Sequence, residues 1–381
     1  MHHIKRKQRA KIMLAGLIML AVSANNASAW PWSKKEIASI ELKFGHVGHD
    51  HHLALFVAAD NSAKFAAKTG VYLKPIKDKK FYELYDGKRK LADITLVKVG
   101  GGSKMPTALA QGVIEVGFGG TAAVLAAVDK GAPIKLISPL HSKGDMFVLA
   151  PDFSANSWKD FVEQAKQSQK PIRIGYKNPI AVAKVIFEEA LKHEGLTFSG
   201  DMSKADVDVH MINVKGGGKL NVSLSAGIID GYVGNNPFPA IGAEKKMLKI
   251  VADLEDLPPG NFKNHPCCCI GAQTKAMTEK GEAIEALLIL LIQATELINN
   301  DLDAAIDSAT KWIGTSRSVE SNSIPTSGYS MQVSAAWHTH MQVWLDSMSG
   351  LGIFSGKLKD LDEKGVAEMA YDLSLLKKAN D

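Results

Sequence analysis

Cysteine is scarce in this sequence. The 381 residues contain three cysteines, and these are adjacent, at Cys267, Cys268 and Cys269. Neighbouring cysteines rarely meet the geometry of a disulfide bond, so the sequence offers no disulfide framework. In a strand, Cys267 and Cys269 would point to one face and Cys268 to the other. We interpret the three thiols first as small buried hydrophobic side chains.

An excess of charge of one sign is also missing from most of the chain. The sequence has 45 Lys and Arg against 40 Asp and Glu. Residues 1–29 hold five of the basic residues and no acidic one, which leaves 40 of each sign in the remainder (45 − 5 = 40). This balance gives no reason to expect nucleic-acid binding.

Hydrophobic runs of membrane-spanning length are absent too. The apolar run near the amino terminus has characteristic flanking residues. Basic residues at positions 5–11 precede an apolar run at 12–22, and Ala27-Ser28-Ala29 follows. The run is too short for a bilayer, which needs about 20 residues. This pattern is typical of a secretory signal peptide, cleaved after residue 29. No cysteine lies near the cut, so we expect no lipoprotein anchor.

Familiar catalytic motifs are not found either: there is no Ser–His–Asp order, phosphate-binding loop or zinc-protease helix. Instead, short apolar segments alternate with helical patterns in two successive sets. Glycine-rich turns follow the strands expected at 95–99, 115–118 and 207–214. This alternation predicts parallel α/β sheets. About 350 residues are too many for one ordinary core, so we expect two domains.

Four passages carry a family resemblance: residues 44–60, 105–138, 223–242 and 265–277. In this order they resemble the solute-binding proteins of nitrate, sulfonate and taurine importers and the related thiamine-pyrimidine family. Together the passages cover most of residues 38–315. One departure is residues 74–93, which are longer and more charged than the family needs. We interpret this insertion as a surface excursion.

The resemblance implies a periplasmic-binding-protein type II-like α/β fold, with two lobes joined by a two-strand hinge and a helical C-terminal tail. Lobe 1 would comprise residues 38–143 and 262–381, and lobe 2 residues 144–261. The implied function is not enzymatic: a monomer without cofactors captures a small polar or anionic molecule, such as a sulfonate, nitrate or pyrimidine, in the periplasm. Its partners would be an ABC permease and ATPase.

Candidate ligand-binding residues lie at the expected strand ends and glycine turns, where backbone N–H groups and helix dipoles favour anions. Residues 46–52 hold four histidines and one carboxylate, whose imidazoles can donate hydrogen bonds to an anion or an amide. We also expect Asp50 to cap the following helix. The candidates are His46, His49, Asp50, His52, Gly101, Ser103, Gly120, Thr121, His141, Asn178, Gly217, Asn235 and Asn236.

Two alternatives remain open. Histidine and cysteine are ligands for zinc, nickel, cobalt or copper. The loop at 46–52 could therefore belong to a metal sensor or metallochaperone, with His49, His51, Cys267 and Cys269 as the less favoured metal ligands. The second alternative is an enzyme resembling fungal thiamine-pyrimidine synthases, which carry a longer cysteine run tied to iron. Here the fourth cysteine is absent, and the export signal disagrees with a cytosolic reaction.

Overall fold

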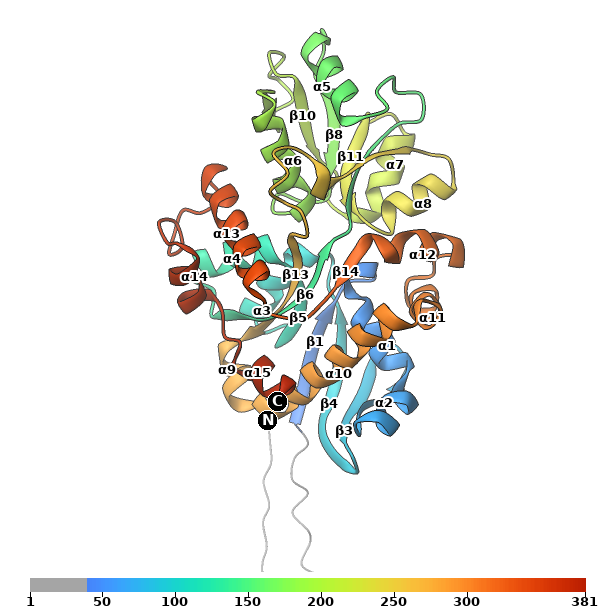
Figure 1. Cartoon of the computed structure of the whole chain (residues 1–381), viewed down its shortest axis with the longest axis vertical. Helices are drawn as coiled ribbons and strands as arrows, with labels where there is room; N and C mark the ends of the chain where they lie inside the picture. Colours follow the sequence, from blue (N-terminus) through green and yellow to red (C-terminus); the bar gives the residue numbers. More distant parts are fainter. Residues whose placement is uncertain (1–39) are drawn as a thin grey trace, which may run out of the picture. The chain divides into compact units, whose positions relative to one another are not determined.

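The computed structural model describes residues 40–381, in which helices surround two β-sheets (Figure 1). The expected signal peptide, residues 1–29, lies outside the described residues. No helix among residues 40–381 combines the length and the apolar character that crossing a bilayer requires.

The first sheet has eight strands in the order β14-β6-β13-β5-β1-β4-β3-β2. Its strands are β1 (Ile40–His46), β2 (Val71–Lys77), β3 (Phe81–Asp86), β4 (Arg89–Lys98), β5 (Val116–Gly120), β6 (Ile134–Lys143), β13 (Pro266–Gln273) and β14 (Ser327–Tyr329).

The second sheet has six strands in the order β12-β7-β11-β8-β10-β9. Its strands are β7 (Asp145–Leu149), β8 (Ile172–Tyr176), β9 (Phe198–Ser199), β10 (Val209–Asn213), β11 (Gly231–Asn235) and β12 (Lys249–Asp253).

Both sheets are mixed: they contain the parallel pairs expected from the sequence and also antiparallel strands. β1 runs parallel to β4 and β5, but β13 runs antiparallel to β5 and β6. In the second sheet, β7 runs antiparallel to β11 and β12. The reversed strands follow from the path of the chain: β7 and β13 each begin where the chain has just arrived from the other sheet.

Helices alternate with the strands as expected from the sequence. The helices are α1 (Leu53–Asp60), α2 (Ser62–Lys68), α3 (Met105–Ala110), α4 (Thr121–Asp129), α5 (Trp158–Gln167), α6 (Val182–His193), α7 (Leu220–Ser225), α8 (Phe238–Glu244), α9 (Thr274–Glu279), α10 (Gly281–Asn300), α11 (Leu302–Ile313), α12 (Arg317–Ser323), α13 (Ala335–Gly350), α14 (Glu363–Ala370) and α15 (Ser374–Asn380). Five short 3-10 helices are η1 (Asp50–His52), η2 (Gly102–Lys104), η3 (Gly217–Lys219), η4 (Leu254–Asp256) and η5 (Ile324–Thr326).

The insertion at residues 74–93, interpreted as a surface excursion, forms regular strands at one edge of the first sheet, where most of its residues are exposed. Its residues extend β2, form β3 and begin β4, and the three strands pair in antiparallel order. Tyr82 and Leu84 of β3 are buried. Alternation of buried and exposed residues along β3 is the ordinary pattern of a strand with one solvated face.

The chain passes between the sheets twice. The first passage is a single residue, Gly144, between β6 and β7, and the second is residues 254–265, between β12 and β13. Gly144 has φ of +85°, a conformation that glycine adopts without strain. A Cβ atom there would lie 2.8 Å from His51 Nε2. The backbone therefore approaches residues 46–52, here called the histidine loop, closely.

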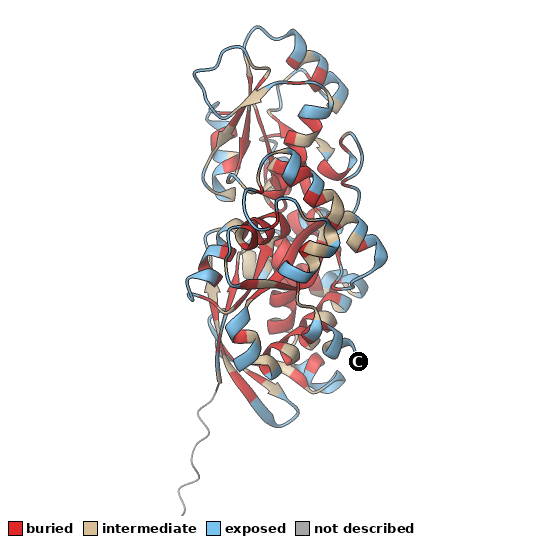
Figure 2. Ribbon diagram, turned by 90° about the vertical axis from the view of Figure 1, so that its left-hand side faces the viewer, coloured by how far each residue is buried: buried red, intermediate tan, exposed pale blue. Residues whose placement is uncertain are grey.

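Buried residues follow the strands, while the outward faces of the helices are exposed (Figure 2). The C-terminal helices complete the covering of the first sheet: α14 and α15 contact β6, and α13 contacts β13. The segment between α13 and α14 is fastened by Asp129 at the end of α4. This buried carboxylate accepts backbone N–H bonds of 2.9–3.0 Å from Ser355, Gly356 and Leu358.

We predict that Asp129→Asn lowers the free energy of unfolding by about 2 kcal/mol, because hydrogen bonds to a charged acceptor are worth roughly 1.5–3 kcal/mol. The amide would also turn a donor toward backbone N–H groups. Urea unfolding followed by circular dichroism measures the change. Asp360→Asn, at an exposed position of the same segment, should leave stability within about 0.5 kcal/mol of wild type. Equal stability of the two variants would contradict this role for Asp129.

Candidate functional site

Polar residues gather at one edge of the first sheet. β1 ends at His46 and β5 ends at Gly120, and the antiparallel β13 begins at that same edge, where Cys268 pairs with Gly120. On its other side Cys268 pairs with His141, near the end of β6. The edge therefore collects the histidine loop, the cysteines and the start of α4 at Thr121.

The histidine loop is a tight turn that ends in η1. His49 N–H donates to Val47 O at 3.0 Å, and His52 N–H donates to His49 O at 3.0 Å. Val47 N–H donates to His52 Nδ1 at 2.7 Å, which makes His52 an acceptor at Nδ1 and leaves the proton on Nε2. The rings of His49 and His52 lie 4.5 Å apart. All four histidines of the loop are buried.

Burial keeps these histidines neutral. It lowers the pKa of His46 to about 4, with help from His52 and Lys98. Burial and the neighbouring His141 lower the pKa of His51 to about 4. The pKa values of His49 and His52 are also lowered, again mainly by burial. A neutral imidazole carries one lone pair. In His52 this lone pair already accepts from Val47 N–H, so its Nε2–H is a donor, whereas His46, His49 and His51 can each accept a hydrogen bond or bind a metal ion.

Several buried polar atoms at this edge have no hydrogen-bond partner in the described protein. A buried polar group without a partner costs about 1–3 kcal/mol of stability. Such atoms therefore mark places where a water molecule, a ligand or an ion can bind. At the edge of the first sheet these atoms are His46 Nδ1, His49 Nδ1, His52 Nε2, Thr121 Oγ1 and His141 Nε2. Asn178 Oδ1, which follows β8 of the second sheet, is a further one.

Asp50 does not have the expected capping role. Neither η1 nor α1 has a side-chain N-cap hydrogen bond. Instead, the Asp50 carboxylate accepts a hydrogen bond from Ser323 at the end of α12, beside Glu320. Burial and Glu320 raise the pKa of Asp50 well above its usual value. Asp50 therefore joins the loop to α12 and is a structural residue of the site.

Two glycine turns, one from each sheet, repeat the same local structure. Gly101 and Gly216 have φ of 146° and 142°, and each precedes a 3-10 helix, η2 or η3. The first turn leads into α3 and β5, and the second leads into α7 and β11. Gly216 follows Gly101 by 115 residues, and β11 likewise begins 115 residues after β5. Only glycine adopts such positive φ values readily.

The two turns face one cavity of about 370 Å³. Three of its eleven lining residues are lysines and none is acidic, so its electrostatics favour an anion. The lining residues are Gly100, Gly101, Ser103, Lys104, Lys177, Asn178, Pro179, Asn213, Lys215, Gly216 and Gly217.

The structure thus separates the sequence-predicted residues into two groups. Gly101, Ser103, Asn178 and Gly217 line the cavity. The others are not among its lining residues; they are His46, His49, Asp50, His52, Gly120, Thr121, His141, Asn235 and Asn236. A link between the groups is Lys177, whose ammonium donates to the Asn235 side chain and whose charge contributes to lowering the pKa of His49.

Sequence reasoning missed the three cavity lysines, Lys104, Lys177 and Lys215. A signal was present, because each stands within three residues of a strand end or a glycine turn. The side chain of Asn236, another predicted site residue, forms hydrogen bonds within the protein: its Nδ2 donates to Thr326 Oγ1 at 2.9 Å, and its Oδ1 accepts from Ala240 N–H at 3.2 Å.

The cysteines depart from simple strand alternation. The β13–β6 pairing shifts register on both sides of Cys268. As a result, Cys267 Sγ and Cys268 Sγ lie 4.0 Å apart, and both sulfur atoms lie within 4.0 Å of His51 Nδ1. Of the metal ligands considered from the sequence, His51 and Cys267 belong to this group, whereas His49 and Cys269 do not.

Comparison with known proteins agrees with this architecture. The profile described as the NMT1-like family matches residues 36–314. The chain belongs to the NMT1-like family. An uncharacterised protein of Methanocaldococcus jannaschii, MJ1180, is 34% identical over 133 residues, which are 35% of this chain and 86% of that protein.

Solved structures share the fold of this NMT1-like chain at low sequence identity. A zinc-bound ligand-binding component of an ABC-type import system from Staphylococcus aureus has a TM-score of 0.68 at 15% identity, covering 89% of this chain and 99% of that one. The nitrate-binding protein NrtA of Synechocystis has a TM-score of 0.66 at 14% identity, covering 90% and 88%. The alkanesulfonate-binding protein SsuA of Xanthomonas axonopodis has a TM-score of 0.62 at 16% identity, covering 87% and 98%. The predicted periplasmic-binding-protein fold is confirmed.

We predict that His46 makes stability fall as the pH is lowered from 6.5 toward 4. In this range the unfolded chain protonates His46 at its usual pKa of 6.5, but the folded protein does not until about pH 4. The contribution of His46 to the free energy of unfolding is therefore complete above pH 6.5 and falls as the pH is lowered. At pH 5 the loss is about 2 kcal/mol.

The raised pKa values of Asp50 and Glu320 act in the opposite direction, so the test compares two proteins. Urea unfolding at pH 7 and pH 5 should show a smaller loss for His46→Gln than for wild type. An equal loss in both proteins would mean that His46 is not held neutral by the fold.

Proposed function

We propose that this protein is the extracytoplasmic solute-binding component of an ABC importer and that it captures a small anion in the cavity between the two glycine turns. The cavity itself is the main support for this proposal. Two equivalent turns, from the two sheets, and three lysines converge on one space that has no acidic lining residue.

The chemistry of the lining explains why an anion is preferred. Turns with positive φ leave backbone N–H groups open to a ligand, and short helices begin directly after them. Lys177 is only partly exposed, so its charge is less screened by solvent than that of a fully exposed lysine. The hydroxyl of Ser103 and the amide of Asn178 add polar groups that fix the orientation of a ligand.

We infer that the two sheets belong to lobes that close on the solute, residues 38–143 with 262–381 and residues 144–261. Support comes from the two short passages between the sheets, at Gly144 and at residues 254–265, because hinges are a few residues that absorb a change of backbone angles. The export pattern of residues 1–29 supports a periplasmic location, and an ABC permease and ATPase would be the partners.

The proposed function predicts a specific effect of one lysine. The mature chain, residues 30–381, should bind at least one of nitrate, ethanesulfonate and glutarate in isothermal titration calorimetry. Lys177→Gln should weaken that binding about 10- to 100-fold, because a hydrogen bond to a charged group contributes roughly 1.5–3 kcal/mol.

Lys170→Gln is the matched control, since Lys170 is exposed and precedes the other end of β8. This variant should bind like wild type, and thermal unfolding without ligand verifies that both variants are folded. Binding of an aminopyrimidine with no binding of any anion would overturn the anionic ligand class. Equal binding by both variants would move the site away from the cavity.

A further inference from the structure

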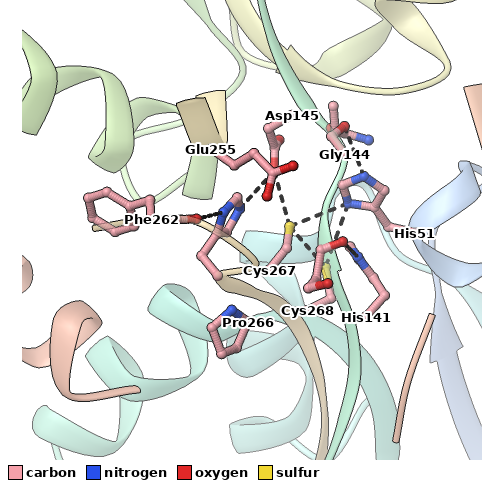
Figure 3. A network of polar contacts seen from close by, with 12 residues as sticks. His51, His141, Gly144, Asp145, Glu255, Phe262, Pro266, Cys267 and Cys268 are labelled. Atoms are coloured by element: carbon pink, nitrogen blue, oxygen red, sulfur yellow. Dashed lines mark hydrogen bonds and ion pairs between the residues drawn. The ribbon is translucent and has the colours of Figure 1, made fainter. Parts of the chain in front are cut away.

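Four potential metal ligands lie together away from the cavity lining. They are His51 of η1, His141 of β6, and Cys267 and Cys268 of β13 (Figure 3). Each offers one donor atom, and these atoms all lie within 4.8 Å of one another. The four side chains are at most 5% exposed, and the cysteines are free thiols. Cysteines that only pack in a hydrophobic core have apolar neighbours. Cys267 and Cys268 instead lie beside two imidazoles.

The two imidazoles are oriented as metal ligands are. His51 Nε2 lies 3.3 Å from Gly144 O, and His141 Nδ1 lies 3.2 Å from Ser142 O. When these nitrogens donate to the carbonyl oxygens, the other nitrogen of each ring keeps its lone pair. His51 Nδ1 then faces Cys267 Sγ at 3.5 Å, and His141 Nε2 is buried without a partner. A ring N–H held by a backbone carbonyl is the usual support of a metal-binding histidine.

The distances suit a tetrahedral ion. Zinc bonds of about 2.3 Å to sulfur and 2.0–2.1 Å to nitrogen place two tetrahedral ligands roughly 3.6–3.8 Å apart. The separations here are 4.0 Å between the two sulfurs, and 3.5 and 4.0 Å from His51 Nδ1 to the sulfurs of Cys267 and Cys268. Only small side-chain movements would bring the four atoms to one ion.

A carboxylate stands behind the cluster. Cys267 Sγ donates to Asp145 Oδ2 at 3.1 Å, and His265 Nε2 lies 3.8 Å from the same oxygen (Figure 3 labels Asp145 beside Cys267). Asp145 therefore accepts the hydrogen bond of the Cys267 thiol in the metal-free protein, and this proton is released when a metal ion binds.

We propose that His51, His141, Cys267 and Cys268 form a closed Cys2His2 site for one Zn²⁺ ion. Binding forms two Zn–S and two Zn–N bonds and releases the two thiol protons, with no change of oxidation state. Two thiolates and two imidazoles in tetrahedral arrangement favour zinc. Four protein ligands leave no open position, so the ion is structural and ties η1, β6 and β13 together beside the passage at Gly144.

Access for the ion comes from a second cavity of about 200 Å³, not from the lysine-lined one. His141 and Pro266 line it together with His340 and Trp337 of α13. The zinc site and the solute cavity therefore have no lining residue in common. Zinc binding can be tested without any solute, so its failure would leave the proposed anion site untouched.

The test is metal titration of the mature chain after chelation and removal of the chelator. We expect one Zn²⁺ per chain by elemental mass spectrometry, with release of protons to the buffer. Substitution by Co²⁺ should give the intense visible and near-ultraviolet absorption of a tetrahedral cobalt–thiolate site. This spectrum needs no variant, so the test does not depend on a mutant that folds.

Cys268→Ala should weaken zinc binding by about 100-fold or more, since even loss of a supporting residue costs roughly 10- to 100-fold. The matched control is Cys269→Ala, the adjacent buried cysteine outside the cluster, which should keep one Zn²⁺ per chain. Three results would overturn the site: no bound zinc, a cobalt spectrum without thiolate absorption, or a Cys267–Cys268 disulfide in the exported protein.

Discussion

Polar groups buried without protein partners are the physical constraint around which this protein is organised. The edge of the first sheet holds four histidines of one loop, Thr121 and the cysteines, and several of their atoms have no hydrogen-bond partner among residues 40–381. Burying such atoms costs free energy that a well-packed apolar core would not cost. We infer that these unpaired polar groups have a binding role. The strands of the first sheet place all of them at one edge.

The second organising feature is a repeated unit. Strand, glycine turn, 3-10 helix, short helix and strand occur twice, 115 residues apart, once in each sheet. In each copy, the glycine turn after the first strand lets the backbone approach a ligand closely, and lysines stand beside both turns. The histidine edge lies near this cavity, because the charge of Lys177, which lines the cavity, contributes to lowering the pKa of His49. The proposed anion site and the proposed zinc site are thus separate: the first lies between turns from both sheets, and the second lies at the edge of the first sheet.

Much of this arrangement could be predicted from the sequence. Alternating strands and helices indicated the α/β fold class, and four of the predicted ligand-binding residues, Gly101, Ser103, Asn178 and Gly217, line one cavity. These features depend on local sequence, because turn conformation and strand ends are encoded within a few residues. The order of the motifs also indicated the family correctly.

Other features depend on contacts far apart in the sequence. Asp50 looks like a helix cap until α12, some 270 residues later, brings Ser323 to its carboxylate. The side-by-side placement of Cys267 and Cys268 comes from the register shifts against β6, which no cysteine spacing reveals. Residues 74–93 form part of the sheet only because β4 is available as a partner.

Occupation of the lysine-lined cavity by a small anion can be measured on the native protein. Native mass spectrometry is applied to the mature chain, isolated from the exported fraction of its own cells. We expect one organic or inorganic anion per chain, in addition to any metal ion, and its release when the protein is unfolded in acid. A polypeptide that carries no anion in any native preparation would show that the cavity does not bind one.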